Sequence, residues 1–296
     1  MIDEITITSL SGRGSVTMRT QDYTGFWLGP VDWGQVTGSH QTYTSPNQVG
    51  ETIASTAVGP RPLSITGWVI DAGTGDLRQR CDFLNAFFSP VEDYALEYRG
   101  KKLGFRPDGS VDYSPERKEN NQVKRKFLIQ ATCSYPLFTD LADTAAAFDV
   151  SGKLFRFPNN FGRESPVLFG TKNQTYTLEV NNPGGFETWL TARFSFSGTV
   201  DNPLLKNLAT GEALGVLRQF SRGEVLEACT MPDRQYLWLY TPQGQRVNIL
   251  KNWDLSTDWI QLKPGRNRLA VGCKDPAQRA AMTVTIFFTP LYMEIQ

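Results

Sequence analysis

Short runs of alternating apolar and polar residues, separated by frequent glycine and proline, constrain the fold of this chain more than any other feature. The 296 residues include 26 glycines and 17 prolines. Between them, Ile5 and Ile7 alternate with threonines, and Phe194 and Phe196 alternate with serines. A period of two with one polar face is typical of short strands in antiparallel sheets. The sequence therefore predicts a mainly β protein.

One hairpin can be located from its turn. Residues 235–240 (QYLWLY) and 245–250 (QRVNIL) flank the sequence Thr-Pro-Gln-Gly. Pro242 fixes φ at the second turn position, and Gly244 can adopt the left-handed conformation that follows. We expect two antiparallel strands joined by this turn.

One helix is predicted between residues 76 and 90. Asp76 suits the N-cap position, and Gln79 three residues later completes a capping box. The apolar residues of the segment recur at helical spacing on one face: Leu77, Cys81, Leu84 and Phe88. Pro90 ends the helix. We expect the apolar face to pack on a sheet.

The length of the chain suggests two domains. The boundary is expected between residues 136 and 166, where a strand ends at Pro136 and an alanine-rich stretch leads into a segment full of turn residues. A break near residue 145 gives a domain of residues 1–145 and a domain of residues 146–296.

Composition narrows the possible functions. Lys plus Arg and Asp plus Glu are each 30, so the formal net charge is 0, whereas proteins that depend on phosphate contacts usually have a basic excess. The single histidine, His40, excludes a two-histidine zinc site, and its polar surroundings favour an exposed or hydrogen-bonded role. No signal-peptide pattern or bilayer-spanning run is visible. We predict no metal, no cofactor, no membrane partner and no sequence-specific nucleic acid.

The four cysteines are Cys81, Cys133, Cys229 and Cys273, and they form no CxxC motif. Because no signal peptide is visible, free thiols are expected. A disulfide between Cys229 and Cys273 stays open as an alternative, since these two residues could lie on neighbouring strands.

A glycine-rich turn precedes the predicted helix and invites comparison with a dinucleotide-binding loop. Gly73 and Gly75 fit that pattern, but Arg78 occupies the place of the third glycine. The charge of Asp76 would also oppose an anion at the helix N-terminus. We interpret the segment as a strand–turn–helix connection.

Two carboxylates offer the best candidate for catalysis or sugar binding. Asp254 and Asp258 are four residues apart, between Trp253 and Trp259. Acids beside aromatic rings are typical of sugar-hydrolysing clefts, and Trp253, Asp254 and Trp259 could instead form a saccharide platform without hydrolysis. The same residue types also stabilise loops through side-chain to backbone hydrogen bonds.

A basic run is the other candidate interaction site. Its members are Arg117, Lys118, Lys124, Arg125 and Lys126. Glu116 and Glu119 dilute its charge, and Asn120-Asn121 predicts a loop tip. The run is either a solvated hairpin or an electrostatic contact to a partner, and it lacks the interleaved aromatics of a base-stacking surface.

Two stretches, taken together, resemble a known family. In the first, an Arg-x-Leu-x-Ile-x-Gly strand that begins at Arg61 is followed by the predicted helix, by Phe-Ser-Pro and then by Leu-x-Tyr. In the second, a Leu-x-Pro-Gly-x-Asn turn runs from Leu262 to Asn267. Their order and spacing over residues 60–272 resemble the distal tail proteins of long-tailed bacteriophages, whereas residues 20–58 match that family poorly.

The resemblance implies an architecture. The N-terminal domain would be a split β-barrel-like fold with one helix, six copies of which close a ring, and the C-terminal domain would be a galectin-like β-sandwich. The galectin sugar site needs a His-x-Asn-x-Arg strand, which is absent because His40 lies in the other half of the chain.

The resemblance also implies a role. The protein would be a non-enzymatic structural component of the virion, assembled in the host cytoplasm and placed at the distal end of the tail. As a baseplate hub it would join the tail tube protein to the tail-tip hub protein and anchor receptor-binding or side-fibre proteins. The basic run would face the ring lumen or the tail tube.

Two alternative functions remain open at this point. One is a monomeric carbohydrate-binding β-sandwich that uses Trp253, Asp254 and Trp259. The other is a glycoside hydrolase that uses Asp254 and Asp258. Assembly state separates both from the ring-forming tail protein.

Overall fold

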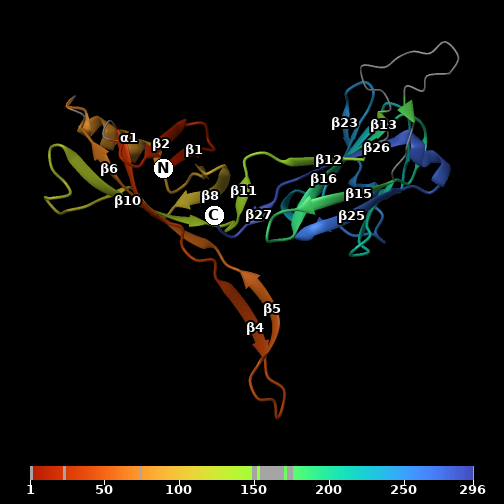
Figure 1. Ribbon diagram of the computed structural model, residues 1–296, viewed down its shortest axis with the longest axis horizontal. Helices are drawn as coiled ribbons and strands as arrows, with labels where there is room; N and C mark the ends of the chain where they lie inside the picture. Colours follow the sequence, from red (N-terminus) through yellow and green to blue (C-terminus); the bar gives the residue numbers. More distant parts are fainter. Residues whose placement is uncertain are drawn as a thin grey trace, which may run out of the picture. The chain divides into compact units, whose positions relative to one another are not determined.

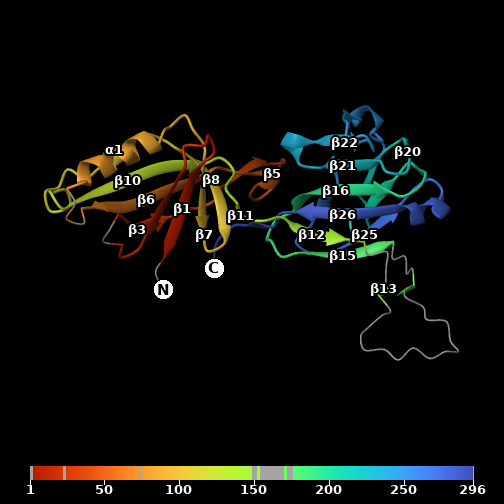
Figure 2. The ribbon, with the colours of Figure 1, turned by 90° about the horizontal axis from the view of Figure 1, so that it is seen from above.

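The computed structural model describes residues 3–22, 25–71, 73, 75–148, 152–153, 170–171 and 176–295. The chain divides into unit 1, which is Met1–Leu141 with Tyr292–Gln296, and unit 2, which is Ala142–Leu291 (Figures 1 and 2). The predicted break near residue 145 differs from this division, because it falls inside strand β12 (Thr144–Ala147), which pairs with β26 (Met282–Phe288) of unit 2. Most of the turn-rich segment after it lies outside the described residues.

Unit 1 is built on a ten-stranded sheet with the order β27-β11-β8-β7-β1-β2-β3-β6-β10-β9. Its strands are β1 (Glu4–Ser9), β2 (Ser15–Arg19), β3 (Phe26–Asp32), β6 (Arg61–Ile70), β7 (Tyr94–Tyr98), β8 (Lys101–Pro107), β9 (Asp112–Tyr113), β10 (Lys124–Cys133), β11 (Phe138–Asp140) and β27 (Leu291–Tyr292). The predicted alternation is confirmed, because Ile5 and Ile7 are fully buried on one face of β1.

The predicted helix is present as α1 (Leu77–Phe87). Its buried residues are Leu77, Cys81, Leu84 and Phe87, and they join the core of unit 1. The capping box is wrong, since Asp76 makes no side-chain cap hydrogen bond. Instead, Asp71 Oδ1 accepts from the backbone N–H groups of Gly73 and Gly75, each at 3.0 Å. The glycine-rich turn is therefore closed by a side chain of its own strand end.

Gly67 shows why one strand position has no side chain. It lies on the buried face of β6, opposite Phe127 of β10. A Cβ atom there would approach the Phe127 ring to 2.5 Å and the Trp27 carbonyl oxygen to 2.8 Å. The close packing of three adjacent strands therefore requires glycine.

The last residues of the chain return to unit 1 around a buried arginine. Arg61 is 2% exposed, and its guanidinium lies 4.9 Å from the centre of the Phe138 ring. Arg61 Nη2 donates to the carbonyl oxygen of Met293, and burial lowers the Arg61 pKa. This arrangement holds the chain end against β6, a tertiary contact that no local pattern indicates.

Unit 2 is a sandwich of two main sheets around one core. The larger has the order β12-β26-β16-β21-β22-β23, with β24 paired to β16; the smaller has the order β15-β25-β18-β19. Their remaining strands are β15 (Thr177–Asn182), β16 (Thr188–Phe196), β18 (Leu204–Asn207), β19 (Ala213–Gly215), β21 (Val225–Cys229), β22 (Tyr236–Tyr240), β23 (Arg246–Asn248), β24 (Gln261–Leu262) and β25 (Gly265–Gly272). The predicted fold class, mainly β with a helix-bearing first domain and a sandwich as the second, is confirmed.

Short elements complete unit 2. They are the pairs β13 (Gly152–Lys153) with β14 (Gly170–Thr171) and β17 (Val200–Asp201) with β20 (Gln219–Phe220), and the 3₁₀ turns η1 (Pro232–Arg234), η2 (Leu250–Asn252) and η3 (Pro276–Ala281). The predicted hairpin is confirmed as β22–β23, in which Tyr240 pairs with Arg246. Gly244 has φ +80° and its N–H donates to Thr241 O at 2.9 Å.

Candidate functional site

A two-stranded hairpin of unit 1 stands apart from its ten-stranded sheet. Strands β4 (Gly38–Tyr43) and β5 (Thr52–Val58) pair only with each other in the sheet topology. Figure 1 shows β4 and β5 projecting together away from the other strands of unit 1, and in the chain they lie between β3 and β6. We call residues 38–58 the arm. Since β3 and β6 pair directly with each other, the arm is an insertion between two neighbouring strands.

The arm exposes apolar side chains on a strand pair that covers no core. Every residue of β4 is exposed, as is every residue of β5 except Thr52. Tyr43, Ile53 and Val58 are each more than half exposed. A lone two-stranded hairpin is at best marginally stable in water, and both of its edges present unpaired backbone groups. The exposed apolar side chains make this ribbon a candidate contact surface.

The only histidine of the sequence lies on the arm. His40 Nδ1 is 2.8 Å from Thr56 Oγ1 on the partner strand, and the two residues are directly opposite in the register. Both are exposed. The expectation of an exposed, hydrogen-bonded histidine is confirmed, and the contact joins the two strands of the arm.

The predicted basic residues gather at the loop between β9 and β10, but acidic neighbours offset part of their charge. Lys126 Nζ lies 3.0 Å from Glu119, and Lys118 Nζ lies 3.1 Å from Glu116. The hydrogen bond from Lys126, with another from Ser114, lowers the pKa of the Glu119 carboxyl.

The other three basic residues differ in exposure. Arg117 and Lys124 are exposed, while Arg125 is half-buried. Arg125 Nε is buried and has no hydrogen-bond partner among the described residues. The loop therefore presents Arg117, Lys118 and Lys124 outward, and a role in partner binding stays a prediction.

Trp253 and Trp259 lie together in unit 2, but they stack on each other. Their ring centres are 5.0 Å apart at an angle of 29°, and both rings pack against the sandwich core. Asp254 Oδ1 accepts from the N–H and the hydroxyl of Ser256, at 3.0 and 2.7 Å. These bonds lower the Asp254 pKa, whereas a general acid in a glycosidase needs a raised one. The use of this trio as a saccharide platform stays a prediction.

All four cysteines are free, so the alternative of a Cys229–Cys273 disulfide is wrong. Within the described part of the chain, no cluster of three potential metal ligands occurs. None of the helices in that same part has the length and apolar character to cross a membrane.

No local pattern in the sequence indicates the arm, and a second feature is also not evident from sequence. A hollow of about 360 Å³ lies on the outer face of the larger sheet of unit 2. Its side chains come from strands far apart in sequence, so only the register of the sheet brings them together.

These features define a class: a two-unit β protein with an exposed two-stranded arm inserted in its first unit. Residues 183–292 match the family described as siphovirus-type tail component, C-terminal domain. The match covers most of unit 2, which is therefore similar to the C-terminal domain of siphovirus-type tail components. The predicted resemblance to phage tail proteins and the predicted location, in the virion at the distal end of the tail, are confirmed.

One solved structure shares the fold over nearly the whole chain. The distal tail protein Dit (gp 19.1) of phage SPP1, described as a paradigm of the hub adsorption apparatus in phages infecting Gram-positive hosts, is 18% identical, with a TM-score of 0.66 over 97% of this chain and 98% of that chain. A chain of the phage P2 baseplate in its activated conformation aligns over 100% of both chains, at 8% identity and a TM-score of 0.47. No curated protein sequence matches.

Proposed function

We propose that this protein is the hub of a phage tail tip, in which six copies close into a ring through unit 1. The ring joins the tail tube protein to the tail-tip hub protein, and unit 2 anchors receptor-binding or side-fibre proteins. The role is mechanical and involves no turnover. The family match of unit 2 and the fold shared with the SPP1 protein support this proposal.

The exposed apolar side chains of the arm are the observation that most supports ring formation. A ribbon with Tyr43, Ile53 and Val58 exposed gains stability when a neighbouring copy covers it. Contact between the arm of one copy and a different surface of the next is heterologous, and such contacts close into rings when the rotation allows it. Closure also covers the open strand edges that would otherwise promote aggregation.

The basic loop supports contact with a second protein. Arg117, Lys118 and Lys124 point outward from the loop between β9 and β10, and exposed charges of one sign steer an acidic partner surface toward them. We propose that this loop faces the tail tube or the ring lumen. Since exposed charges are screened by salt, this contact weakens as ionic strength rises.

The native mass of the purified protein tests the ring. Light scattering after size exclusion should give about 199 kDa, six times the chain mass of 33.1 kDa, or twice that value for two stacked rings. A mass of 33.1 kDa that does not change when purified tail tube protein is added would contradict the proposal.

Variants of the arm test its part in closure. Replacing Ile53 and Val58 together by serine should reduce the mass to that of one chain and leave the unfolding midpoint unchanged. The matched control is Leu255→Ser, because Leu255 is 85% exposed but lies in unit 2. If the variant with serine at both positions still has the mass of a hexamer, the arm is not required for ring closure.

A further inference from the structure

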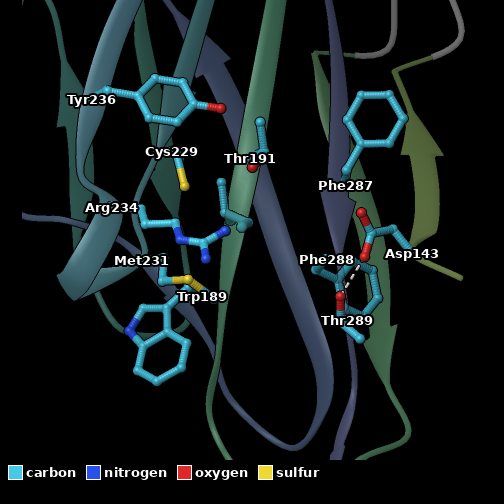
Figure 3. Close-up of a pocket in the computed structure, with 11 residues that line it drawn as sticks. Asp143, Trp189, Thr191, Cys229, Met231, Arg234, Tyr236, Phe287, Phe288 and Thr289 are labelled. Carbon is cyan, nitrogen blue, oxygen red and sulfur yellow. Dashed lines mark hydrogen bonds between the residues drawn. The ribbon is translucent and has the colours of Figure 1, made fainter. Parts of the chain in front are cut away.

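The hollow of about 360 Å³ on the outer face of unit 2 is built by one row of paired residues. Thr191 of β16 pairs with Phe287 of β26 on one side and with Cys229 of β21 on the other. Cys229 in turn pairs with Tyr236 of β22. Trp189 lies two residues before Thr191 and therefore on the same face of β16. Four strands thus contribute to a single concave site (Figure 3).

Two aromatic rings of the hollow are fixed at their polar ends. Trp189 Nε1 lies 2.9 Å from the Gln261 amide oxygen when that amide is oriented to donate to Glu187. Tyr236 donates from its hydroxyl to Glu227 at 3.0 Å. Because these bonds satisfy the polar ends, the rings can offer apolar surface without leaving a buried donor unpaired.

Charged groups of opposite sign lie on the two sides of the hollow. Figure 3 shows Arg234 reaching from η1 toward β16, and Asp143 on the opposite side beside β26. The Asp143 carboxylate accepts a hydrogen bond from the Thr289 hydroxyl, which fixes its orientation. A guanidinium offers several donors in one plane and a carboxylate is an acceptor, so the pair can hold a ligand that carries both donors and acceptors.

Two outward residues beside the hollow offer little free apolar surface. The next outward residue of β22 is Trp238, and Arg246 covers its ring at 4.4 Å. The neighbouring Arg193 of β16 is exposed and pairs across the sheet with Glu227. A broad protein interface would need about 800 Å² of surface on each partner, whereas this site offers one small depression with a charged group at either side. A compact ligand fits it better than a folded partner.

We propose that this hollow binds a sugar unit of a saccharide chain, with Trp189 against the apolar face of the ring and Arg234 and Asp143 on its hydroxyl groups. A sugar ring combines one face of C–H groups with a rim of hydroxyls that both donate and accept, and the hollow provides matching surfaces. Its volume lies at the lower end of the range of about 300–1,000 Å³ for small-molecule sites. The site lies wholly in unit 2, apart from the Trp253–Trp259 stack, and does not depend on ring assembly.

The test is titration of the full-length protein with three probes: maltotriose, lactose and chitotriose, each followed by calorimetry and by saturation-transfer NMR. We expect at least one of the three to bind at one site per chain. Trp189→Ala should weaken that binding at least tenfold, and Arg234→Gln at least threefold. The matched control is Arg193→Gln, which removes a guanidinium from the adjacent row of the same face and should leave binding unchanged.

Three outcomes would overturn the proposal. One is that none of the three saccharides binds at millimolar concentration. Another is that Arg193→Gln weakens binding as much as Arg234→Gln does. The third is that a purified tail protein, rather than a saccharide, binds and is lost with Trp189→Ala, which would make the hollow a protein interface. Circular dichroism of each variant checks folding, and Arg234→Gln still tests the site if Trp189→Ala does not fold.

Discussion

Two hairpins of this protein have similar strands and opposite surroundings. In β22–β23 of unit 2, Leu237 and Leu239 point into the sandwich core and are 0% and 3% exposed. In the arm of unit 1, Ile53 and Val58 are 57% and 51% exposed. The first hairpin is stabilised by its own chain, because it is one part of a larger sheet. The second has only its own ladder and the contacts of its cross-strand pairs.

The difference separates apolar side chains that are buried on folding from those that only a second chain could bury. Burial of Leu237 and Leu239 is completed on folding, so these two side chains gain nothing further from a partner. The arm leaves its apolar side chains in water until another chain covers them. Substitutions should therefore change stability in one hairpin and association in the other.

The largest effect is expected from truncating a core side chain of the β22–β23 hairpin. Leu237→Ala should lower the free energy of unfolding of unit 2 by about 2–5 kcal/mol, because it removes buried methyl groups and leaves a cavity. The same truncation in the arm, Ile53→Ala, should change it by less than about 0.5 kcal/mol. Urea unfolding of the isolated chain, followed by tryptophan fluorescence, measures both.

Equal losses of unfolding free energy in Leu237→Ala and Ile53→Ala would contradict this difference between the hairpins. It would mean that the arm is packed against its own chain in solution. Leu255→Ala, at an exposed apolar position of unit 2, shows the background expected for a substitution that touches no core.

The next largest effect is expected in hydrogen exchange. Amide groups of the arm should open in the isolated chain with a free energy near zero, whereas those of β22 should approach the global value. In the assembled ring the arm should become protected while β22 stays as it was. Mass spectrometry of peptides covering the two hairpins compares them directly, and an arm that is already protected in monomers would argue against docking.

A smaller effect distinguishes the two turns. Gly244 at φ +80° and Gly50 at φ +83° both lie in the left-handed region, with open space around the Cβ position. Gly244→Ala should lower the global free energy of unfolding by roughly 1–2 kcal/mol, because alanine is strained in the left-handed conformation. The same strain at Gly50 should not appear there, because the arm opens before the rest of unit 1 unfolds. A matching loss at Gly50 would show that arm and sheet unfold together.

The elements that pack on a core could largely be predicted from the sequence, because the patterns that indicate them are local. The alternation of Leu237 and Leu239, the Pro-Gln-Gly turn and the apolar stripe of α1 each depend on residues that are near one another in the chain. The cap of α1 could not be predicted, because Asp71, five residues before Asp76, binds the turn instead.

The arm, the chain end and the hollow could not be predicted because they depend on distant residues. The sequence of β5 alternates only weakly, and nothing in it says that neither face is covered. The burial of Arg61 depends on Met293, 232 residues away. Trp189 and Tyr236 become neighbours only through the register of β16, β21 and β22. The predicted candidates were instead residues close in sequence, such as Trp253 and Trp259, whose rings stack on each other.

A third hairpin, the β9–β10 loop, lies between the two extremes, since polar contacts within the loop hold it. Glu119 accepts from Lys126 at 3.0 Å and from Ser114 at 2.8 Å, and these bonds lower its pKa. The folded pKa therefore lies below the unfolded value of about 4.3. The folded state binds fewer protons, so the stabilisation is present above about pH 4.3 and is lost as the pH falls through the folded pKa.

The smallest effect follows from this pH dependence. At neutral pH, wild type should unfold at a higher temperature than Glu119→Gln, and the gap should close on acidification to about pH 3. The gap should also shrink with added salt, because the carboxylate lies near the surface. Thermal unfolding over a pH series measures it, with Glu116→Gln as the control, since Lys118, the partner of Glu116, is 79% exposed. If the difference in unfolding temperature stays constant with pH, packing of the Glu119 side chain accounts for it. The loop would then resemble the β22–β23 hairpin, which is stabilised by packing.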